Sequence, residues 1–314
     1  MVSRMNNEQT GTLTQKWSNL RDAAFRLKQR TIDVIDRQQG GVSKFYDNYI
    51  LNSINFLEKR LSIISTGLDA RPAWEQGQIQ KVLCRLEGVI SKNIQGRYLT
   101  SEQRHAQANT PDGRKIYQHP HGDEVDNYTI NMSQGVDSCM HWKGQPIFKT
   151  VFDFSLHSML LWDVKPKTII EIGSGTGASA IWMADLMTVF ELETKIFSLD
   201  IKKVTTIPHK NIRFIQGDCN AIDHVFPIKM LAELPHPWVV IEDAHVDVLN
   251  VLRHLSVNML VGDYMIVEDS RGKKAPDVLT WSNLNKNKFK IDTKYTDYFG
   301  RNATCSPDTI FVRL

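Results

Sequence analysis

The sequence predicts an α/β protein with a doubly wound, Rossmann-like parallel sheet, preceded by a helical N-terminal segment. A β-branched run ends in a glycine-rich turn at 168–178, short β-like runs alternate with helical stretches after residue 150, and helical periodicity dominates before it. We therefore expect a helical region at 1–130 and an α/β domain at 131–314. The helical region is expected to act as a lid, in substrate selection or in oligomerisation.

Three amphipathic helices are expected in the N-terminal half, because apolar residues recur there at helical spacing. The faces are Leu13, Trp17, Leu20, Ala24 and Leu27 in the first; Tyr46, Tyr49, Ile50, Ile54, Leu57 and Leu61 in the second; and Val82, Leu86, Val89 and Ile90 in the third. An ordinary core explains these stripes, and a dimerisation surface or an active-site cover is the alternative.

Residues 100–127 are polar and irregular, which predicts a loop. The segment contains Thr110-Pro-Asp-Gly113 and His119-Pro-His121-Gly-Asp-Glu124. A solvated loop is the simplest interpretation, and a substrate lid is the second. The His-Pro-His run with its two acids is a third candidate, as a transition-metal site.

The α/β domain is expected to have strands at 167–172, 195–199, 212–215, 238–241, 264–267 and 309–313. Helices are expected at 153–162, 178–190 and 246–258. Ligands of such sheets bind outside the carboxyl ends of the strands. The residues that follow each strand are therefore the functional candidates.

The glycine-rich turn indicates a cofactor site. Its glycines allow close approach of backbone to a ligand at a helix N-terminus. The carboxylate of Glu171 would repel a pyrophosphate but suits an aminoacyl ligand with an ammonium group, which favours S-adenosylmethionine. By glycine spacing a dinucleotide such as NAD is the alternative. The candidate residues are Glu171, Gly173, Ser174, Gly175 and Gly177.

Acids also follow the next two strands. Asp200 is placed to accept the two ribose hydroxyls of an adenosyl cofactor, and Asp218, followed by Cys219, is placed to hold the adenine amino group. Helix capping by surface acids is the alternative.

Two further strands each end in a pair of carboxylates, Glu242-Asp243 and Glu268-Asp269. Carboxylates that lie together at one sheet edge raise each other's pKa unless a cation neutralises them. A site made only of oxygen ligands favours a hard ion such as Mg²⁺. Helix capping is again the alternative. His245 follows the first pair closely, so its imidazole is a candidate general base.

Five separated stretches carry a family resemblance. They are Trp142-Lys-Gly144-Gln-Pro146-Ile-Phe-Lys149 with Asp153, Ile170-Glu-Ile-Gly173 to Gly177, Glu242-x-x-His245, Gly262-Asp-Tyr-Met-Ile-Val-Glu268-Asp269 and Phe299-Gly-x-Asn302-x-Thr304-x-x-Pro307. Residues 140–314 thereby resemble the cephalosporin hydroxylase and rhamnosyl O-methyltransferase family, which includes metal-dependent methyltransferases of natural products.

The resemblance implies a class I methyltransferase sheet, metal ligands at Glu242, Glu268 and Asp269, and a base at His245. The family's first ligand is usually Asp, so Asp243 is the alternative to Glu242. The expected activity is S-adenosylmethionine- and Mg²⁺-dependent O-methylation of a polyketide, peptide or glycoside, free or carrier-bound. An oxidoreductase or hydroxylase and a non-catalytic binding protein are the alternatives.

Composition limits the partners and the compartment. A net charge of +3 without a long Lys/Arg block does not favour nucleic acid. The four cysteines form no C-x-x-C pair, which favours free thiols, and no apolar run is long enough for a membrane span. We expect a cytoplasmic protein that acts on a small molecule, and the apolar stripes are compatible with a homo-oligomer.

Overall fold

The structure is a computed structural model that describes residues 12–37, 139–204 and 208–314, with short pieces and single residues between 51 and 137. The chain forms two compact units, Met1–Leu99 and Thr100–Leu314. In the first unit, helix α1 (Leu13–Arg37) confirms the first predicted helix, and its Ala24 is fully buried. The second and third stripes, and the Thr110–Gly113 and His119–Glu124 motifs, lie outside the described residues.

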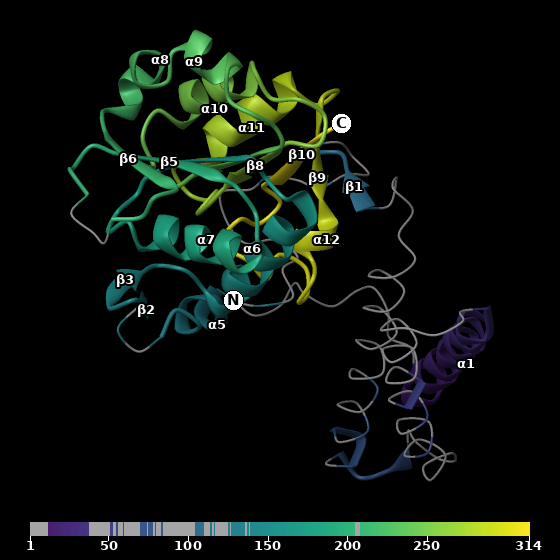
Figure 1. Cartoon of the computed structure of the whole chain (residues 1–314). Coiled ribbons are helices and arrows are strands. Elements are labelled where there is room, and N and C mark those ends of the chain that lie inside the picture. The colour runs from purple at the N-terminus through teal and green to yellow at the C-terminus, as the bar shows by residue number, and fades with distance from the viewer. Residues whose placement is uncertain are drawn as a thin grey trace. The chain divides into compact units, whose positions relative to one another are not determined.

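The second unit is built on an eight-stranded sheet (Figure 1), whose order is β1-β9-β10-β8-β7-β4-β5-β6. Strands β6, β5, β4, β7 and β8 pair in parallel, and β10 runs antiparallel between β8 and β9. The bounds are β1 His105–Ala106, β4 Thr168–Ile172, β5 Lys195–Asp200, β6 Ile212–Gln216, β7 Trp238–Glu242, β8 Tyr264–Val267, β9 Phe289–Asp292 and β10 Ile310–Arg313. The predicted doubly wound α/β sheet is confirmed.

Helices cover both faces of this sheet, as Figure 1 shows. One face carries α6 (Val151–Val164) and α7 (Ala178–Val189), and the other carries α10 (Val248–Ser256) and α11 (Ala275–Leu284). Short helical turns complete the connections: η2 Cys219–Ala221, α8 Ile222–Val225, α9 Ile228–Ala232 and α12 Thr293–Thr296. No helix among the described residues is both long and apolar enough to cross a membrane.

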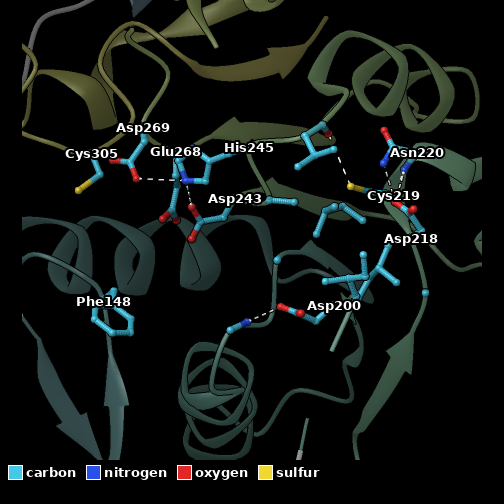
Figure 2. Close-up of a pocket in the computed structure, with 18 of the residues that line it drawn as sticks. Phe148, Asp200, Asp218, Cys219, Asn220, Asp243, His245, Glu268, Asp269 and Cys305 are labelled. Carbon is cyan, nitrogen blue, oxygen red and sulfur yellow. Dashed lines mark hydrogen bonds and ion pairs between the residues drawn. The ribbon is translucent and has the colours of Figure 1, made fainter. Parts of the chain in front are cut away.

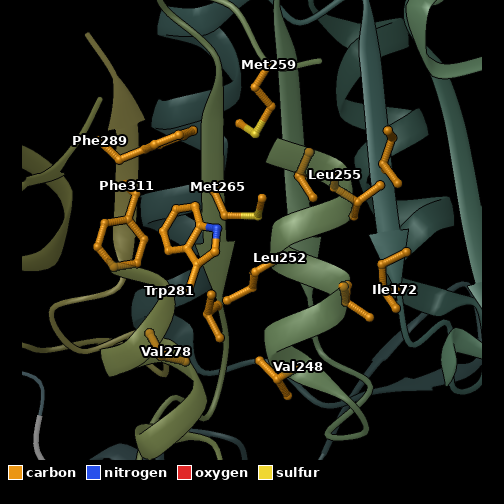
Figure 3. Close-up of a cluster of buried hydrophobic side chains, with 14 of the residues drawn as sticks. Ile172, Val248, Leu252, Leu255, Met259, Met265, Val278, Trp281, Phe289 and Phe311 are labelled. Atoms are coloured by element: carbon orange, nitrogen blue, oxygen red, sulfur yellow. The ribbon is translucent and has the colours of Figure 1, made fainter. Parts of the chain in front are cut away.

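Strand alternation divides the buried side chains between two hydrophobic cores. Ile169 of β4 and Val239 of β7 pack with Trp182 of α7 on one face. The residues next in sequence to these strand positions, Ile170 and Val240, pack on the other face. That second core gathers around Trp281 of α11, with Leu252 and Leu255 of α10 and Met265 of β8 (Figure 3). The face on which a strand residue lies therefore determines which helices its side chain meets.

A small hairpin precedes α6. Its strands β2 (Met140–Trp142) and β3 (Gln145–Ile147) follow the short helix α5 (Asn127–Met132). The indole nitrogen of Trp142 donates to Asp185 of α7 at 2.8 Å, and Thr176 of the glycine-rich turn donates to the Pro146 carbonyl at 2.6 Å. The hairpin is thereby fixed against the turn at the carboxyl end of β4.

Candidate functional site

A cavity of about 540 Å³ lies at the carboxyl ends of β4, β5, β7 and β8. The chain passes from β4 outward to β5 and β6, and then returns to β7 on the other side of β4. The strand order therefore reverses between β4 and β7, and sheets of this kind bind ligands at that switch point. Its size suits a small-molecule site. Nine predicted or alternative site residues line it: Gly173, Gly175, Asp200, Asp218, Cys219, Asp243, His245, Glu268 and Asp269.

The glycine-rich turn follows β4 closely. Gly173 has a φ of 104°, and a Cβ atom there would lie 2.7 Å from the Asp243 carbonyl carbon, so only glycine fits beneath the β7 end. The Gly175 N–H donates to Asp200 Oδ2 at 2.8 Å. Gly177, with a φ of 80°, begins α7. The turn therefore presents backbone to the cavity at a helix N-terminus, as a ligand site requires.

Two predicted cofactor residues lie behind the cavity wall. Glu171 is 1% exposed and accepts hydrogen bonds from the Ser179 and Ser198 hydroxyls, and Ser174 lies 2.6 Å from the Ser198 hydroxyl. Burial raises the pKa of Glu171, although both hydroxyls oppose the shift. The structure places this carboxylate in a network that joins β4, β5 and α7.

One end of the cavity is formed by the residues after β5 and β6. Asp200 closes β5, and Asp218 accepts hydrogen bonds from the backbone and the side-chain amide of Asn220 at 2.9 and 2.8 Å. Cys219 lies beside it, and burial raises the pKa of its thiol. Figure 2 shows these residues on the opposite side of Asp243 from Phe148 and Cys305.

The other end carries a cluster of two carboxylates and an imidazole. One ligand atom from each of Asp243, His245 and Asp269 lies within 4.8 Å of the others, and His245 Nε2 is 3.5 Å from both carboxylates (Figure 2). The pKa of Asp243 is lowered to about 2. Burial alone would raise this pKa, but the Lys149 ammonium and the hydrogen bond with His245 together have the larger, opposite effect. Asp243 is therefore ionised at neutral pH.

Backbone conformation holds this cluster in place. His245 has a φ of 61° and Asp269 a φ of 46°, in the left-handed region that non-glycine residues seldom adopt. Such conformations cost of order 1–3 kcal/mol each and persist where the surroundings impose them, often at functional sites.

Glu242, in contrast, lies away from the cluster. It is the last residue of β7, and its side chain lies on the face of α10 and α11, where it is fully buried. One oxygen lies 2.9 Å from the Lys274 ammonium, and the other accepts the Ala244 and His245 N–H groups. The structure therefore brings Asp243, and not Glu242, to His245 and Asp269.

Glu268 lies at the cavity wall but forms a buried ion pair with Lys149, whose ammonium is also 3.5 Å from Asp243. Burial raises the pKa of Glu268, and the charge of Lys149 opposes this shift. His157 of α6 lies 4.0 Å from Glu268, and burial lowers its pKa to about 4. The buried side chains of Lys149, Glu268 and His157 therefore pack next to the cluster.

Sequence reasoning assigned no role to Lys149, Lys274 or Phe148. Lys149 and Phe148 lie in the Trp142–Lys149 motif, so the motif was a signal for them. The period-2 alternation along β7 would also have separated Glu242 from Asp243.

A sequence model of the rhamnosyl O-methyltransferase/CmcI family matches residues 134–299, over half of the chain. The rhamnosyl O-methyltransferase of Mycobacterium leprae (strain TN) is 29% identical over 136 residues, which cover 41% of this chain and 59% of that protein. The match thus spans less than two thirds of the relative's length.

Three solved structures of CmcI are also similar. The apo form has a TM-score of 0.49 at 25% identity and covers 56% of this chain and 76% of its own. A form with Mg and SAM has a TM-score of 0.48 at 24% identity with the same coverage, and a form with SAH has 0.47 at 23%, covering 62% and 88%. On the match to the family model, the chain belongs to the rhamnosyl O-methyltransferase/CmcI family, which confirms the predicted resemblance.

Proposed function

We propose that this protein is an S-adenosylmethionine- and Mg²⁺-dependent O-methyltransferase that acts on a hydroxyl group of a polyketide, peptide or glycoside. The observation that carries the proposal is that the Asp243–His245–Asp269 cluster and the glycine-rich turn open into one cavity. A donor site and an activating site for an oxygen nucleophile are thereby adjacent.

The residues present fit both groups. Asp243 and Asp269 offer carboxylate oxygens, the ligands that Mg²⁺ prefers, and the cavity side leaves room for water and substrate oxygens. We assign Asp243 and Asp269 as ligands, so that Asp243 takes the role first expected for Glu242. Glu268 is their neighbour at the cavity wall. At the other end, Gly173 and Gly175 line the cavity without side chains, and we assign Asp200 to the ribose and Asp218 to the adenine.

Each residue then has a chemical role. When bound, the cofactors supply a transferable methyl group on a sulfonium and a Lewis acid for the acceptor hydroxyl. His245, about half exposed, takes the proton from that hydroxyl as the oxygen–methyl bond forms and the methyl–sulfur bond breaks, which leaves S-adenosylhomocysteine as the neutral thioether. Asp243 and Asp269 each lie 3.5 Å from His245 Nε2 and thereby orient the ring. Alignment by the cavity contributes up to about 7–11 kcal/mol in such reactions.

The first test is calorimetric titration of metal-stripped protein with S-adenosylmethionine and with NAD⁺, each with and without Mg²⁺. We expect S-adenosylmethionine to bind, and a separate Mg²⁺ heat that is lost in Asp269→Ala. Full turnover in excess EDTA would contradict the metal role. A preference for NAD⁺ would favour the oxidoreductase, and tight cofactor binding without methyl transfer to a broad acceptor panel would favour a binding protein.

We keep two predictions from the sequence in this proposal: a cytoplasmic location, and a lid, substrate-selection or oligomerisation role for residues 1–130. Removal of the first unit, Met1–Leu99, should then change acceptor affinity or the oligomeric mass while S-adenosylmethionine affinity stays the same. Light scattering and the same titration measure the two effects.

A further inference from the structure

The cavity wall is strongly acidic. Five carboxylates line it, from Asp200, Asp218, Asp243, Glu268 and Asp269, and no lysine or arginine is among its described lining residues. Two buried ammonium groups lie next to the acidic cluster, those of Lys149 and Lys274, which are 3% and 2% exposed and pair with Glu268 and Glu242. Neither ammonium is available to a ligand.

Only part of this charge remains after the proposed cofactors bind. Mg²⁺ contributes two positive charges, S-adenosylmethionine a net of one and Lys149 one more, so one of the five carboxylate charges is left uncompensated. An acceptor therefore enters a cavity of negative potential, where low-dielectric walls strengthen the field. A negatively charged acceptor is repelled, and a positively charged one is attracted.

An apolar wall lies at the end of the cavity where the cluster is found. Phe148 lines the cavity and is 58% exposed, whereas its neighbours Ile147 and Lys149 are buried at 2% and 3%. The buried neighbours fix the backbone, so the ring faces outward. Figure 2 shows Phe148 and Cys305 on the side of the acidic cluster away from Asp218.

Two further exposed apolar side chains lie at helix ends outside the cavity lining. Val151 at the start of α6 and Met132 at the end of α5 are both about half exposed, and the Val151 N–H donates to the Ser133 carbonyl, which joins the two helix ends. Exposed apolar groups beside a polar cluster indicate a ligand surface.

From these observations we infer that the acceptor is an uncharged or cationic molecule with an apolar, ring-sized face that packs on Phe148. It presents its hydroxyl, with a neighbouring oxygen, to Asp243, His245 and Asp269. Anionic acceptors bind more weakly, because the carboxylates leave the cavity with a net negative charge. The inference deepens the proposed function and rests on it.

The test uses three catechols that share the ring and the paired oxygens and differ in charge: dopamine, 4-methylcatechol and 3,4-dihydroxyphenylacetate. Their affinities are measured by calorimetry with Mg²⁺ and S-adenosylhomocysteine present. We expect dopamine and 4-methylcatechol to bind at least about ten-fold more tightly than the anion. Addition of about 0.5 M NaCl should narrow this difference.

The aromatic wall is tested by Phe148→Ala, which should weaken 4-methylcatechol about ten-fold, with Phe148→Leu intermediate. Trp162→Ala is the matched control, because Trp162 is an exposed aromatic residue outside the cavity lining. It should leave the affinity unchanged.

Three results would overturn the inference: equal or tighter binding of the anion, no effect of Phe148→Ala, or no catechol binding by protein that binds S-adenosylhomocysteine. Failure to bind S-adenosylhomocysteine would instead contradict the proposed function. The two failures are therefore distinguished by the first titration.

Discussion

Gly173 offers a direct test of how the glycine-rich turn is built. In Gly173→Ala the added Cβ would lie 2.7 Å from both the carbonyl carbon and oxygen of Asp243 and 2.9 Å from the Ala244 nitrogen. These are backbone atoms at the end of β7 and cannot rotate away. The turn or the Asp243 backbone must move, and either movement disturbs both halves of the site.

The magnitude follows from two separable costs. A non-glycine residue at a φ of 104° costs of order 1–3 kcal/mol, and overpacking against backbone adds about 1–3 kcal/mol. Gly262 provides the control, because its φ is 92° but nothing lies within 4 Å of its Cβ position. Gly262→Ala should therefore lose about 1–3 kcal/mol, and Gly173→Ala about 2–6 kcal/mol, of unfolding free energy.

Urea unfolding measures the loss of stability, and calorimetry with S-adenosylhomocysteine and Mg²⁺ measures the loss of binding. Gly262→Ala should keep both affinities, whereas Gly173→Ala should weaken both. Equal destabilisation of the two variants, with both affinities intact in Gly173→Ala, would refute the close approach of the turn to Asp243.

Two further predictions concern buried charges. Glu242→Gln should lower the unfolding free energy by about 3–5 kcal/mol in urea titrations, because it leaves Lys274 buried without its counterion, whereas Asp243→Asn should mainly remove the Mg²⁺ heat. A stable Glu242→Gln variant without Mg²⁺ heat would return the ligand role to Glu242. Because burial lowers the pKa of His157 from 6.5 to about 4, the unfolded chain takes up a proton first as pH falls, and stability is lost between these values. Unfolding at pH 7.5 and 5 should show a loss of about 2 kcal/mol that His157→Gln largely removes, and equal losses in both proteins would contradict this origin.

Much of the α/β domain could be predicted from local patterns. The expected strand at 264–267 matches β8, and the expected helices at 178–190 and 246–258 match α7 and α10 to within two residues. These segments are apolar and regularly spaced, so the pattern determines both element type and position. Helix α11 and strand β9 were not predicted, because their sequences mix polar and apolar residues and depend on packing around Trp281.

The site was partly predictable for the same reason. Strand ends and glycine spacing directed attention to the cavity, and nine of its lining residues follow from that reasoning. The contacts of Glu171 and Glu242 could not be predicted in this way, because each side chain meets a partner far away in sequence: Ser198 for Glu171 and Lys274 for Glu242.

The sequence by itself was sufficient for the fold class, for the place of the candidate site at the carboxyl edge of the sheet, and for the family, since these depend on periodicity and on short motifs. Only the tertiary structure decided which carboxylates lie together. The pleat of β7 turns Glu242 to the α11 side, and the following turn directs Asp243 to His245 and Asp269. Two neighbouring carboxylates have the same charge in the sequence. The direction of each side chain, and the cation that it contacts, depend on tertiary packing.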